Sequence, residues 1–249
     1  MPINDFAELL RMMTVDSKDD GKEFTVRDRL SVIGQLLAGS NYRPVVSEPL
    51  ALVYAQHEPG EGDNVLLVSS HVDCVYGKCF CSDEGDLFRG TFDNSFGNAA
   101  VLWCMLNGRL PANVVVAFTG DEEKDSNGAV QALLALGRMG CCVTSVIVQD
   151  VTNVGWDSGA LFTIENDSGF DLMTAYSIIA SLEQYDGRFA FSHDAEPDEA
   201  WTYAEYGLPV LTLCAPVMGE LHNDAGVLLR KESALEYCNV LSLLANVLR

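Results

Sequence analysis

Three consecutive carboxylates, Asp121, Glu122 and Glu123, follow closely after an apolar run at residues 113–118. An apolar run of this length is typical of a buried strand. Carboxylates at the end of a buried strand repel one another and resist desolvation, so a cation or a catalytic task is needed to keep them there. Other metal-binding or acid–base side chains that converge on this point are therefore the first candidates for function.

The charge of the chain argues against polyanionic partners. Its formal net charge is -21 over 249 residues, so nucleic acid and anionic membrane surfaces would be repelled. No apolar run reaches the roughly 20 residues of a membrane helix, and the N-terminal residues lack a basic start followed by an apolar core. We therefore expect a soluble, cytoplasmic protein whose partner is a small molecule, a peptide or a cation.

The cysteines predict no metal site of their own. Most of the eight lie in apolar runs, where a buried reduced thiol is ordinary. Cys74, Cys79 and Cys81 cluster in a loop, but their number and spacing fit no four-ligand structural zinc pattern.

Predicted strands alternate with predicted helices along the chain. Apolar stripes at helical spacing predict helices at 5–13, 24–37, 98–106, 130–136, 170–182, 201–206 and 235–248. Short apolar or alternating runs predict strands at 43–47, 50–56, 64–70, 113–118, 144–149, 161–164, 188–191 and 210–213, with a loop between residues 74 and 94. This alternation predicts a three-layer α/β/α sandwich around a mixed, mostly parallel sheet, formed by residues 1–249 as a single domain.

Polar side chains gather where the predicted core strands end. In open α/β sheets, functional groups lie in the crevice outside the carboxyl ends of the strands. Taken singly, His71 in a His-x-Asp pattern could be a structural histidine, and Asp93 could merely cap a helix. Together they indicate a site, because all of the candidates are expected at one edge of the sheet. These candidates are His71, Asp93, Glu122, Glu123, Asp150 and His222.

Two imidazoles with three or four carboxylates form a nitrogen-and-oxygen donor set of the kind zinc favours, and cobalt or manganese are alternatives. One ion cannot easily use all of these donors. Two ions can, if one carboxylate bridges them at the separation of about 3.5 to 4 Å found in paired-metal hydrolases.

Five blocks of sequence resemble, in order, the ligand motifs of the di-zinc exopeptidases. This superfamily includes aminopeptidases, dipeptidases and the carboxypeptidases and deacylases related to acetylornithine deacetylase, and the resemblance spans most of the chain. The blocks are His71-Val72-Asp73, the segment 90–97 around Asp93, the segment 119–123, Gln149-Asp150-Val151 and Leu221-His222.

The resemblance implies a role for each matched residue. Asp93 would bridge two metal ions. His71 and Asp150 would be the other ligands of one ion, and Glu123 and His222 would be those of the second. Asp73 would orient His71. Glu122 would be the general base that takes a proton from the attacking water and returns it to the leaving amine. The family also predicts a cis peptide bond between Asp93 and Asn94.

Segment lengths between the blocks indicate the compact aminopeptidase branch without a lid or dimerisation domain. The deacylase branch usually inserts such a domain between the blocks at Asp150 and His222, where predicted core elements occupy the chain. The expected function is release of N-terminal residues from small peptides. An N-acyl amino acid deacylase, a dipeptidase and a non-catalytic binding relative remain alternatives, and a homo-oligomer is compatible with all of them.

Two further residues are candidates on the substrate side. Asp198 lies in Pro197-Asp198-Glu199, where relatives commonly have Gly-Ser/Thr-Asp. His193 could donate a hydrogen bond to an oxyanion, although its neighbours Ser192 and Asp194 favour an ordinary solvated loop histidine.

Overall fold

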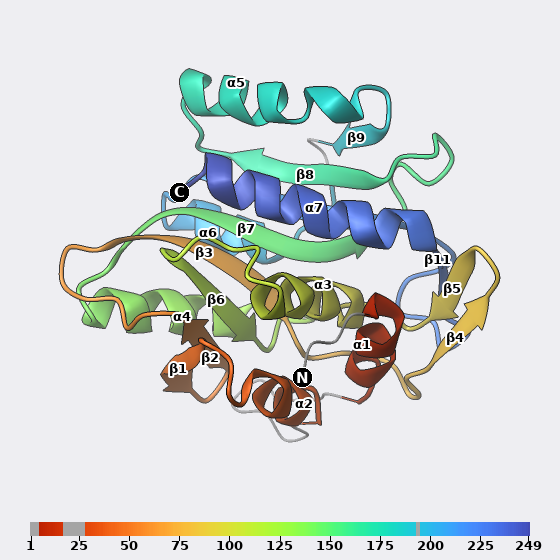
Figure 1. Ribbon diagram of the computed structural model, residues 1–249, viewed down its shortest axis with the longest axis horizontal. Helices are drawn as coiled ribbons and strands as arrows, with labels where there is room; N and C mark the ends of the chain where they lie inside the picture. Colours follow the sequence, from red (N-terminus) through yellow and green to blue (C-terminus); the bar gives the residue numbers. More distant parts are fainter. Residues whose placement is uncertain (1–4, 17–27, 193–194) are drawn as a thin grey trace.

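The computed structural model describes residues 5–16, 28–192 and 195–249, in which helices and strands alternate over most of the chain (Figure 1). The α-helices are α1 (Phe6–Met13), α2 (Asp28–Leu37), α3 (Ser95–Leu106), α4 (Asn127–Arg138), α5 (Leu172–Ser181), α6 (Glu199–Glu205) and α7 (Lys231–Val247), with a 3₁₀ turn at Glu183–Tyr185. The strands are β1 (Arg43–Glu48), β2 (Ala51–Ala55), β3 (Asn64–His71), β4 (Cys81–Glu84), β5 (Leu87–Gly90), β6 (Val114–Thr119), β7 (Cys142–Thr152), β8 (Phe162–Ser168), β9 (Phe189–Ser192), β10 (Val210–Met218) and β11 (Val227–Arg230).

Four parallel strands form the centre of the sheet, in the order β6-β3-β7-β10. Antiparallel strands extend both sides: the β1–β2 hairpin pairs with β6, and β8 pairs with β10. Because β6, β3, β7 and β10 run in the same direction, their carboxyl ends open on one edge of the sheet. The mixed, mostly parallel centre predicted from the sequence is therefore correct.

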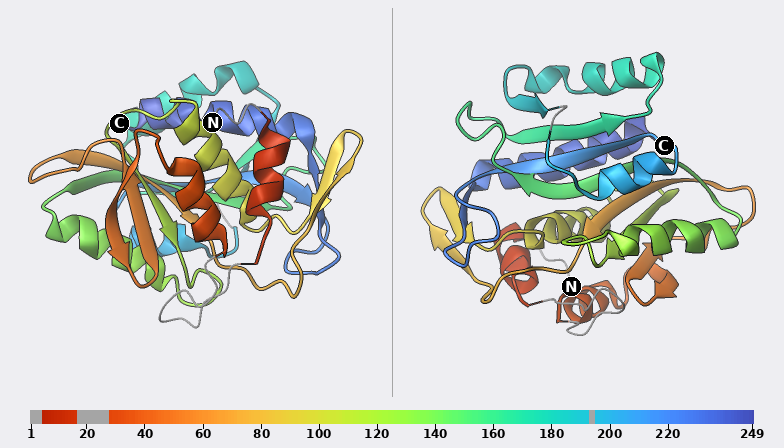
Figure 2. Two further views of the ribbon diagram at one scale, coloured as in Figure 1. Left: turned by 60° about the horizontal axis from the view of Figure 1, so that its bottom comes forward. Right: turned by 180° about the vertical axis from the view of Figure 1, so that it is seen from behind.

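Helices cover the sheet on both faces (Figures 1 and 2). One apolar core lies between the sheet and the layer containing α1, α2, α3 and α7, and a smaller core lies beneath α4 and α6. Successive residues of β6 alternate between them: Val114 and Val116 belong to the first core, Val115 and Ala117 to the second. Burial on both faces explains why these strands are continuous apolar runs rather than alternating ones.

On the α6 side, the sheet changes from apolar to polar toward the carboxyl ends of the parallel strands. Val146 and Val148 of β7 lie in the smaller core, and Asp150 follows on the same face because side chains in a strand alternate. In β3 the same succession runs from Leu67 to Ser69 and His71. This end of the face is where a polar site can form without breaking the apolar core.

Several predicted boundaries are wrong. The expected loop between residues 74 and 94 contains the β4–β5 hairpin, whose strands are only four residues long, and β11 pairs with it. β7 extends two residues beyond Asp150, so this residue lies within a strand rather than after it. The start of the helix predicted at 24–37 lies outside the described residues, and Cys142 is exposed although it follows an apolar pattern.

Across the described residues, we find no helix that is both long and apolar enough to cross a membrane.

The contact between α4 and the end of β6 yields a stability prediction. A Cβ added at Gly128 would lie 2.5 Å from the backbone N and O of Gly120 and 2.6 Å from the carbonyl oxygen of Leu50. Backbone atoms cannot move aside cheaply, so we expect Gly128→Ala to lower the free energy of unfolding by about 2 kcal/mol or more. Denaturant titration followed by circular dichroism measures this change.

Gly137 in the same helix is the matched control. Its added Cβ would meet nothing within 4 Å, so Gly137→Ala should leave stability unchanged or raise it by up to about 1 kcal/mol through helix propensity. Equal effects of the two substitutions would contradict the close approach of α4 to Gly120.

Candidate active site

A cavity of about 570 Å³ opens at the carboxyl ends of the parallel strands. Its walls come from elements far apart in sequence, and their chemistry is dominated by carboxylates. The residues that line it include Asp93, Glu122, Glu123, Asp150, Glu165, Glu196, Asp198 and His222. The cavity therefore coincides with the edge at which the sequence predicts a site.

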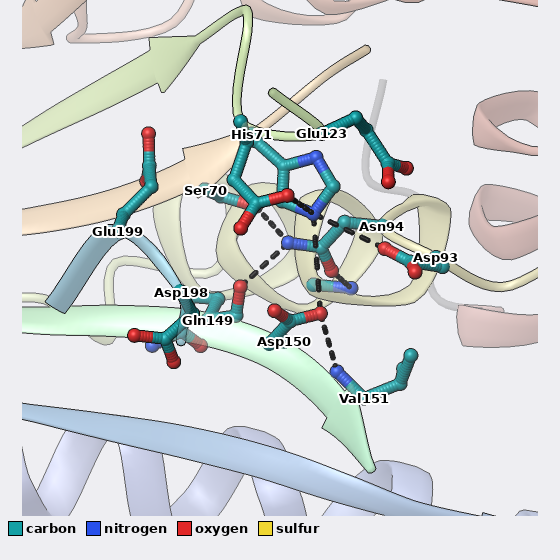
Figure 3. Close-up of polar contacts among 12 residues, drawn as sticks. Ser70, His71, Asp93, Asn94, Glu123, Gln149, Asp150, Val151, Asp198 and Glu199 are labelled. Carbon is teal, nitrogen blue, oxygen red and sulfur yellow. Dashed lines mark hydrogen bonds and ion pairs between the residues drawn. The ribbon is translucent and has the colours of Figure 1, made fainter. Parts of the chain in front are cut away.

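His71 and Asp93 form the inner part of this site (Figure 3). His71 is the last residue of β3 and its side chain is 1% exposed. Its Nε2 lies 3.1 Å from Asp93 Oδ1 and 3.9 Å from an oxygen of both Glu122 and Asp150. Asp93 reaches this position from the turn between β5 and α3.

A second group meets the other oxygen of Asp93. His222, in the loop after β10, has its Nε2 3.0 Å from Asp93 Oδ2 and 3.2 Å from Glu123 Oε2. Donor atoms of His71, Asp93 and Asp150 lie within 4.8 Å of one another, and so do those of Asp93, Glu123 and His222. Asp93 is thus common to two compact donor groups, one on each of its oxygens. A third group of this kind joins His71, Glu122 and Glu123.

The opposite side of the His71 ring faces Asp73. Nδ1 of His71 lies 3.3 Å from Asp73 Oδ1, and Asp73 Oδ2 accepts a hydrogen bond of 3.3 Å from the backbone N–H of Glu123. Asp73 therefore links the β3 and β6 ends and holds the imidazole with Nε2 toward Asp93. A carboxylate on the far nitrogen is the usual partner of a metal-binding histidine.

Crowding of negative charge shifts the pKa values of the site. Burial raises the pKa of Glu122 to about 9 and that of Glu123 to about 8; repulsion from Asp93 adds to both shifts. Burial likewise raises the pKa of Asp150 to about 6.

The surrounding carboxylates favour the charged form of the two histidines. Burial alone would lower the pKa of His71, but the surrounding carboxylates, Glu122 foremost, raise it well above its usual value. The hydrogen bond to Asp93 raises the pKa of His222 to about 9. Burial opposes ionisation of Asp93, but its contacts with His222 and His71 prevail and hold its pKa below the usual range.

These residues fit divalent cations on two grounds. Oε1 of Glu123 is buried and lacks a hydrogen-bond partner among the described residues, and Nε2 of His71 and Oδ1 of Asp93, although 3.1 Å apart, form no hydrogen bond with each other. Buried polar atoms without partners are costly unless an ion or water satisfies them. The donors are imidazole nitrogens and carboxylate oxygens, the set that suits zinc, cobalt or manganese.

Arg29 of α2 supports the site from beneath. It is fully buried, and its guanidinium donates hydrogen bonds to the backbone carbonyls of Val72, Asp73 and Asp93. One side chain therefore connects the loop after β3 to the turn that carries Asp93. This role could not be predicted from the sequence, because a single arginine near the start of an amphipathic helix is usually a solvated residue.

The N-terminus of α3 is tied to the central strands by two asparagines. Asn98 Nδ2 donates to Ser70 Oγ at 2.8 Å and to the His71 carbonyl at 2.7 Å, and Asn94 Nδ2 donates to the Gln149 carbonyl. Asn94, rather than Asp93, caps α3 by accepting from the Gly97 N–H. The carboxylate of Asp93 is thus left for the cavity, and the Asp93–Asn94 peptide bond is cis, as predicted.

Asp198 lines the cavity, but both of its oxygens already have partners. Oδ1 accepts from the Ala200 N–H and caps α6, while Oδ2 accepts from the Thr212 hydroxyl at 2.6 Å. A substrate role for Asp198 remains a prediction. His193, the other substrate-side candidate, lies outside the described residues.

Two buried glutamates near the site were not anticipated. Glu199 is fully buried beneath the end of β3, where Ser69 Oγ donates to its Oε2 at 2.7 Å, and burial raises its pKa to about 7. Glu165 of β8 lines the cavity and is 6% exposed. Its sequence signal is weak: a glutamate that directly follows the predicted strand 161–164.

Comparison with known proteins identifies the class. A family model described as Peptidase family M28 matches residues 53–225. This span includes every predicted metal ligand and covers well over half of the chain, so the chain belongs to peptidase family M28 and is a metal-dependent peptide hydrolase. A comparison with curated protein sequences gave no match.

Solved structures with the same fold include aminopeptidases at low sequence identity. An aminopeptidase from the archaeon Desulfurococcus kamchatkensis is 11% identical with a TM-score of 0.75, covering 98% of this chain and 94% of its own. A TET aminopeptidase from a marine sediment thaumarchaeon is 11% identical with a TM-score of 0.74, covering 98% and 96%. The TET1 peptidase of Pyrococcus horikoshii is 14% identical with a TM-score of 0.71, covering 97% and 99%.

Crowding of Glu122 and Glu123 predicts how the site responds to metal removal. Chelation would leave these carboxylates without a compensating cation, so we expect residues 120–126 to lose protection against amide hydrogen exchange before other buried segments do. Exchange measured by mass spectrometry with and without chelator tests this. The β1–β2 hairpin should be unaffected, and a uniform response, or none in 120–126, would contradict the expectation.

Proposed function

We propose that this M28 peptidase is a two-metal aminopeptidase that releases N-terminal residues from small peptides. The observation that carries the proposal is the position of Asp93: its two carboxylate oxygens lie about 3 Å from imidazole nitrogens of two different donor groups, 3.1 Å from His71 and 3.0 Å from His222. A carboxylate shared in this way is what a pair of ions requires.

In this proposal His71 and Asp150 would be ligands of one ion, and Glu123 and His222 would be ligands of the other. Asp93 would be a ligand of both. Zinc is the expected metal, and cobalt or manganese would suit the same donors. Two bound cations would lower the pKa of a water molecule and polarise the scissile carbonyl. They would also offset the burial and the repulsion from Asp93 that together raise the pKa values of Glu123 and Asp150.

Glu122 is proposed as the general base. It belongs to neither of the two donor groups that share Asp93, yet its Oε2 lies 3.9 Å from His71 Nε2 and its side chain is 13% exposed in the cavity wall. A carboxylate held beside the ions without binding them can take the proton of the attacking water and pass it to the leaving amine. Asp73 holds the His71 ring in place during these steps.

The charge of the cavity favours a substrate with a free α-ammonium group. Seven of the side chains that line it are carboxylates, and the chain as a whole carries a net charge of -21. Such a field attracts cationic groups and repels anionic ones. An N-acyl amino acid deacylase would have to bind a neutral N-blocked substrate with a free carboxylate, which this field disfavours; dipeptides with a free N-terminus remain compatible.

We propose that residues 1–249 form one catalytic domain without a lid. The segment between Asp150 and His222 supports this, because its strands β8 and β10 pair with each other and β10 pairs with β7. It thus contributes to the central sheet instead of forming a lid.

Replacing Glu122 by Gln tests the catalytic assignment. The amide keeps the shape of the side chain but cannot accept the proton, so we expect kcat on aminoacyl-coumarin substrates to fall by about 10²-fold or more. Bound metal, measured by mass spectrometry of the purified protein, should stay unchanged.

Full activity of Glu122→Gln would contradict its role as base, and loss of both metals would make it a ligand. N-acetylated substrates provide the comparison with the deacylase alternative, which predicts faster cleavage of the blocked forms. A protein that binds no metal and cleaves neither substrate would be the non-catalytic relative.

We also propose that the chain forms a homo-oligomer through α5. Four large apolar side chains on this helix are exposed, Leu172 by 88%, Met173 by 75%, Tyr176 by 71% and Ile179 by 57%, and α5 lies on the outer side of the molecule (Figure 2). An apolar group of this kind is uncommon on a monomer. The TET1 peptidase of Pyrococcus horikoshii, a structural neighbour, can assemble into a tetrahedron or an octahedral shell.

Light scattering after size-exclusion chromatography should give a mass that is a multiple of 27.1 kDa. We expect Met173→Glu combined with Tyr176→Glu to shift it to the monomer, because charges would then be buried at the interface. Leu134→Glu is the control, since Leu134 is 50% exposed on α4, which covers the other face of the sheet from α5 and α7. A monomeric wild type would refute the proposal.

A further inference from the structure

The floor of the cavity continues beyond the predicted metal ligands along one face of the sheet. Asp150 of β7 lies beside Cys214 of β10, and Thr212, two residues earlier in β10, lies beside Glu165 of β8. Side chains two residues apart in a strand point the same way, so all four face the cavity side. The backbone of Glu165 is therefore displaced from that of Asp150 by two strand spacings across the sheet, roughly 10 Å, and by two residues along the strands, roughly 7 Å.

Glu165 is a buried carboxylate with one unsatisfied oxygen and no cationic partner among the described residues. Its Oε1 has no hydrogen-bond partner among the described residues, and no ion pair between described residues involves it. Its Oε2 accepts a hydrogen bond from the thiol of Cys214, at 3.6 Å. A contact with the Thr152 hydroxyl offsets part of the effect of burial on the pKa of Glu165, but Oε1 stays without a hydrogen-bond partner among the described residues. A buried carboxylate left in this state is costly unless a ligand completes it.

The surroundings of Glu165 suit a cation on a long apolar stem. Asp150 and Asp198 lie close enough to repel its charge, so this end of the cavity is short of positive charge. The residues that line the cavity also include the apolar Val154 and Pro197. Lys124 also lines the cavity, but it is exposed on the loop that carries Glu123. This loop follows β6, which β3, β7 and β10 separate from β8 in the sheet.

We propose that Glu165 recognises a basic side chain, lysine or arginine, in the N-terminal residue of the peptide; this inference rests on the aminopeptidase function proposed above. With the scissile carbonyl beside Asp93 and Asp150, the four-carbon stem of lysine extends along the floor and its ammonium group meets Glu165. The carboxylate then forms a charge-assisted hydrogen bond away from bulk water, where such bonds are strongest.

The alternative is that Glu165 binds the α-ammonium group, which every N-terminal residue carries. The two assignments differ in which substrates depend on Glu165. A contact to the α-ammonium affects all aminoacyl substrates alike, whereas a contact to the side chain affects only basic ones.

Lysine and norleucine separate these cases, because norleucine has the same stem without the terminal nitrogen. We expect the wild type to cleave lysyl-coumarin amide with a kcat/KM at least about tenfold above that of the norleucyl compound. Glu165→Gln should abolish this preference by slowing lysyl cleavage about tenfold or more while leaving norleucyl cleavage within about twofold. Glu196→Gln is the matched control, since Glu196 lines the same cavity but is exposed, and the preference should persist.

Calorimetric binding of free L-lysine and L-norleucine to the metal-loaded protein gives a readout that does not require turnover. Tighter binding of lysine, lost in Glu165→Gln, supports the inference even if catalysis is slow. Equal loss on both substrates, a preference that survives Glu165→Gln, or a wild type that favours norleucine would overturn it. A wild type that cleaves neither substrate yet binds lysine selectively would refute the aminopeptidase function and leave the recognition of the basic side chain standing.

Discussion

Repulsion among buried carboxylates is the constraint on which the site depends. Asp93, Glu122, Glu123 and Asp150 meet around one fully buried imidazole, and burial with mutual repulsion raises the pKa values of Glu122, Glu123 and Asp150. Only Asp93, between two histidines, keeps a lowered pKa. An arrangement this unfavourable for the apoprotein is expected where cations are part of the folded state. The cations that make it stable are also the ones that would activate water, so stability and catalysis depend on the same charges.

The remaining structure can be understood as the support for that cluster. Parallel strands bring His71, Glu123 and Asp150 to one edge, and the two apolar cores hold those strands from both faces. Arg29 fixes the backbone on either side of the cluster by binding carbonyl groups, so its charge is placed beneath the carboxylates without pairing directly with any of them. The asparagines at the start of α3 then leave Asp93 free to face both donor groups.

Much of this could be predicted from the sequence, for identifiable reasons. Strands buried on both faces leave continuous apolar runs, so β3, β6, β7 and β10 were found, and the polar residues at their ends could be assigned to one edge. The β4–β5 hairpin was missed because its strands are only four residues long and β4 is largely polar, so no run of strand length stands out. Arg29 and Glu165 were missed because their importance comes from partners that only folding brings together: carbonyls of two separate segments for Arg29, and the register of β8 on β10 for Glu165.

Metal stoichiometry shows whether Asp93 is shared by two cation sites. Zinc bound per chain can be measured by mass spectrometry for the wild type, His222→Ala and Asp93→Ala, each checked for folding by circular dichroism. We predict two equivalents for the wild type, about one for His222→Ala, and loss of both at stoichiometric zinc for Asp93→Ala. An Asp93→Ala protein that is folded and still binds two equivalents as tightly as the wild type would contradict the claim.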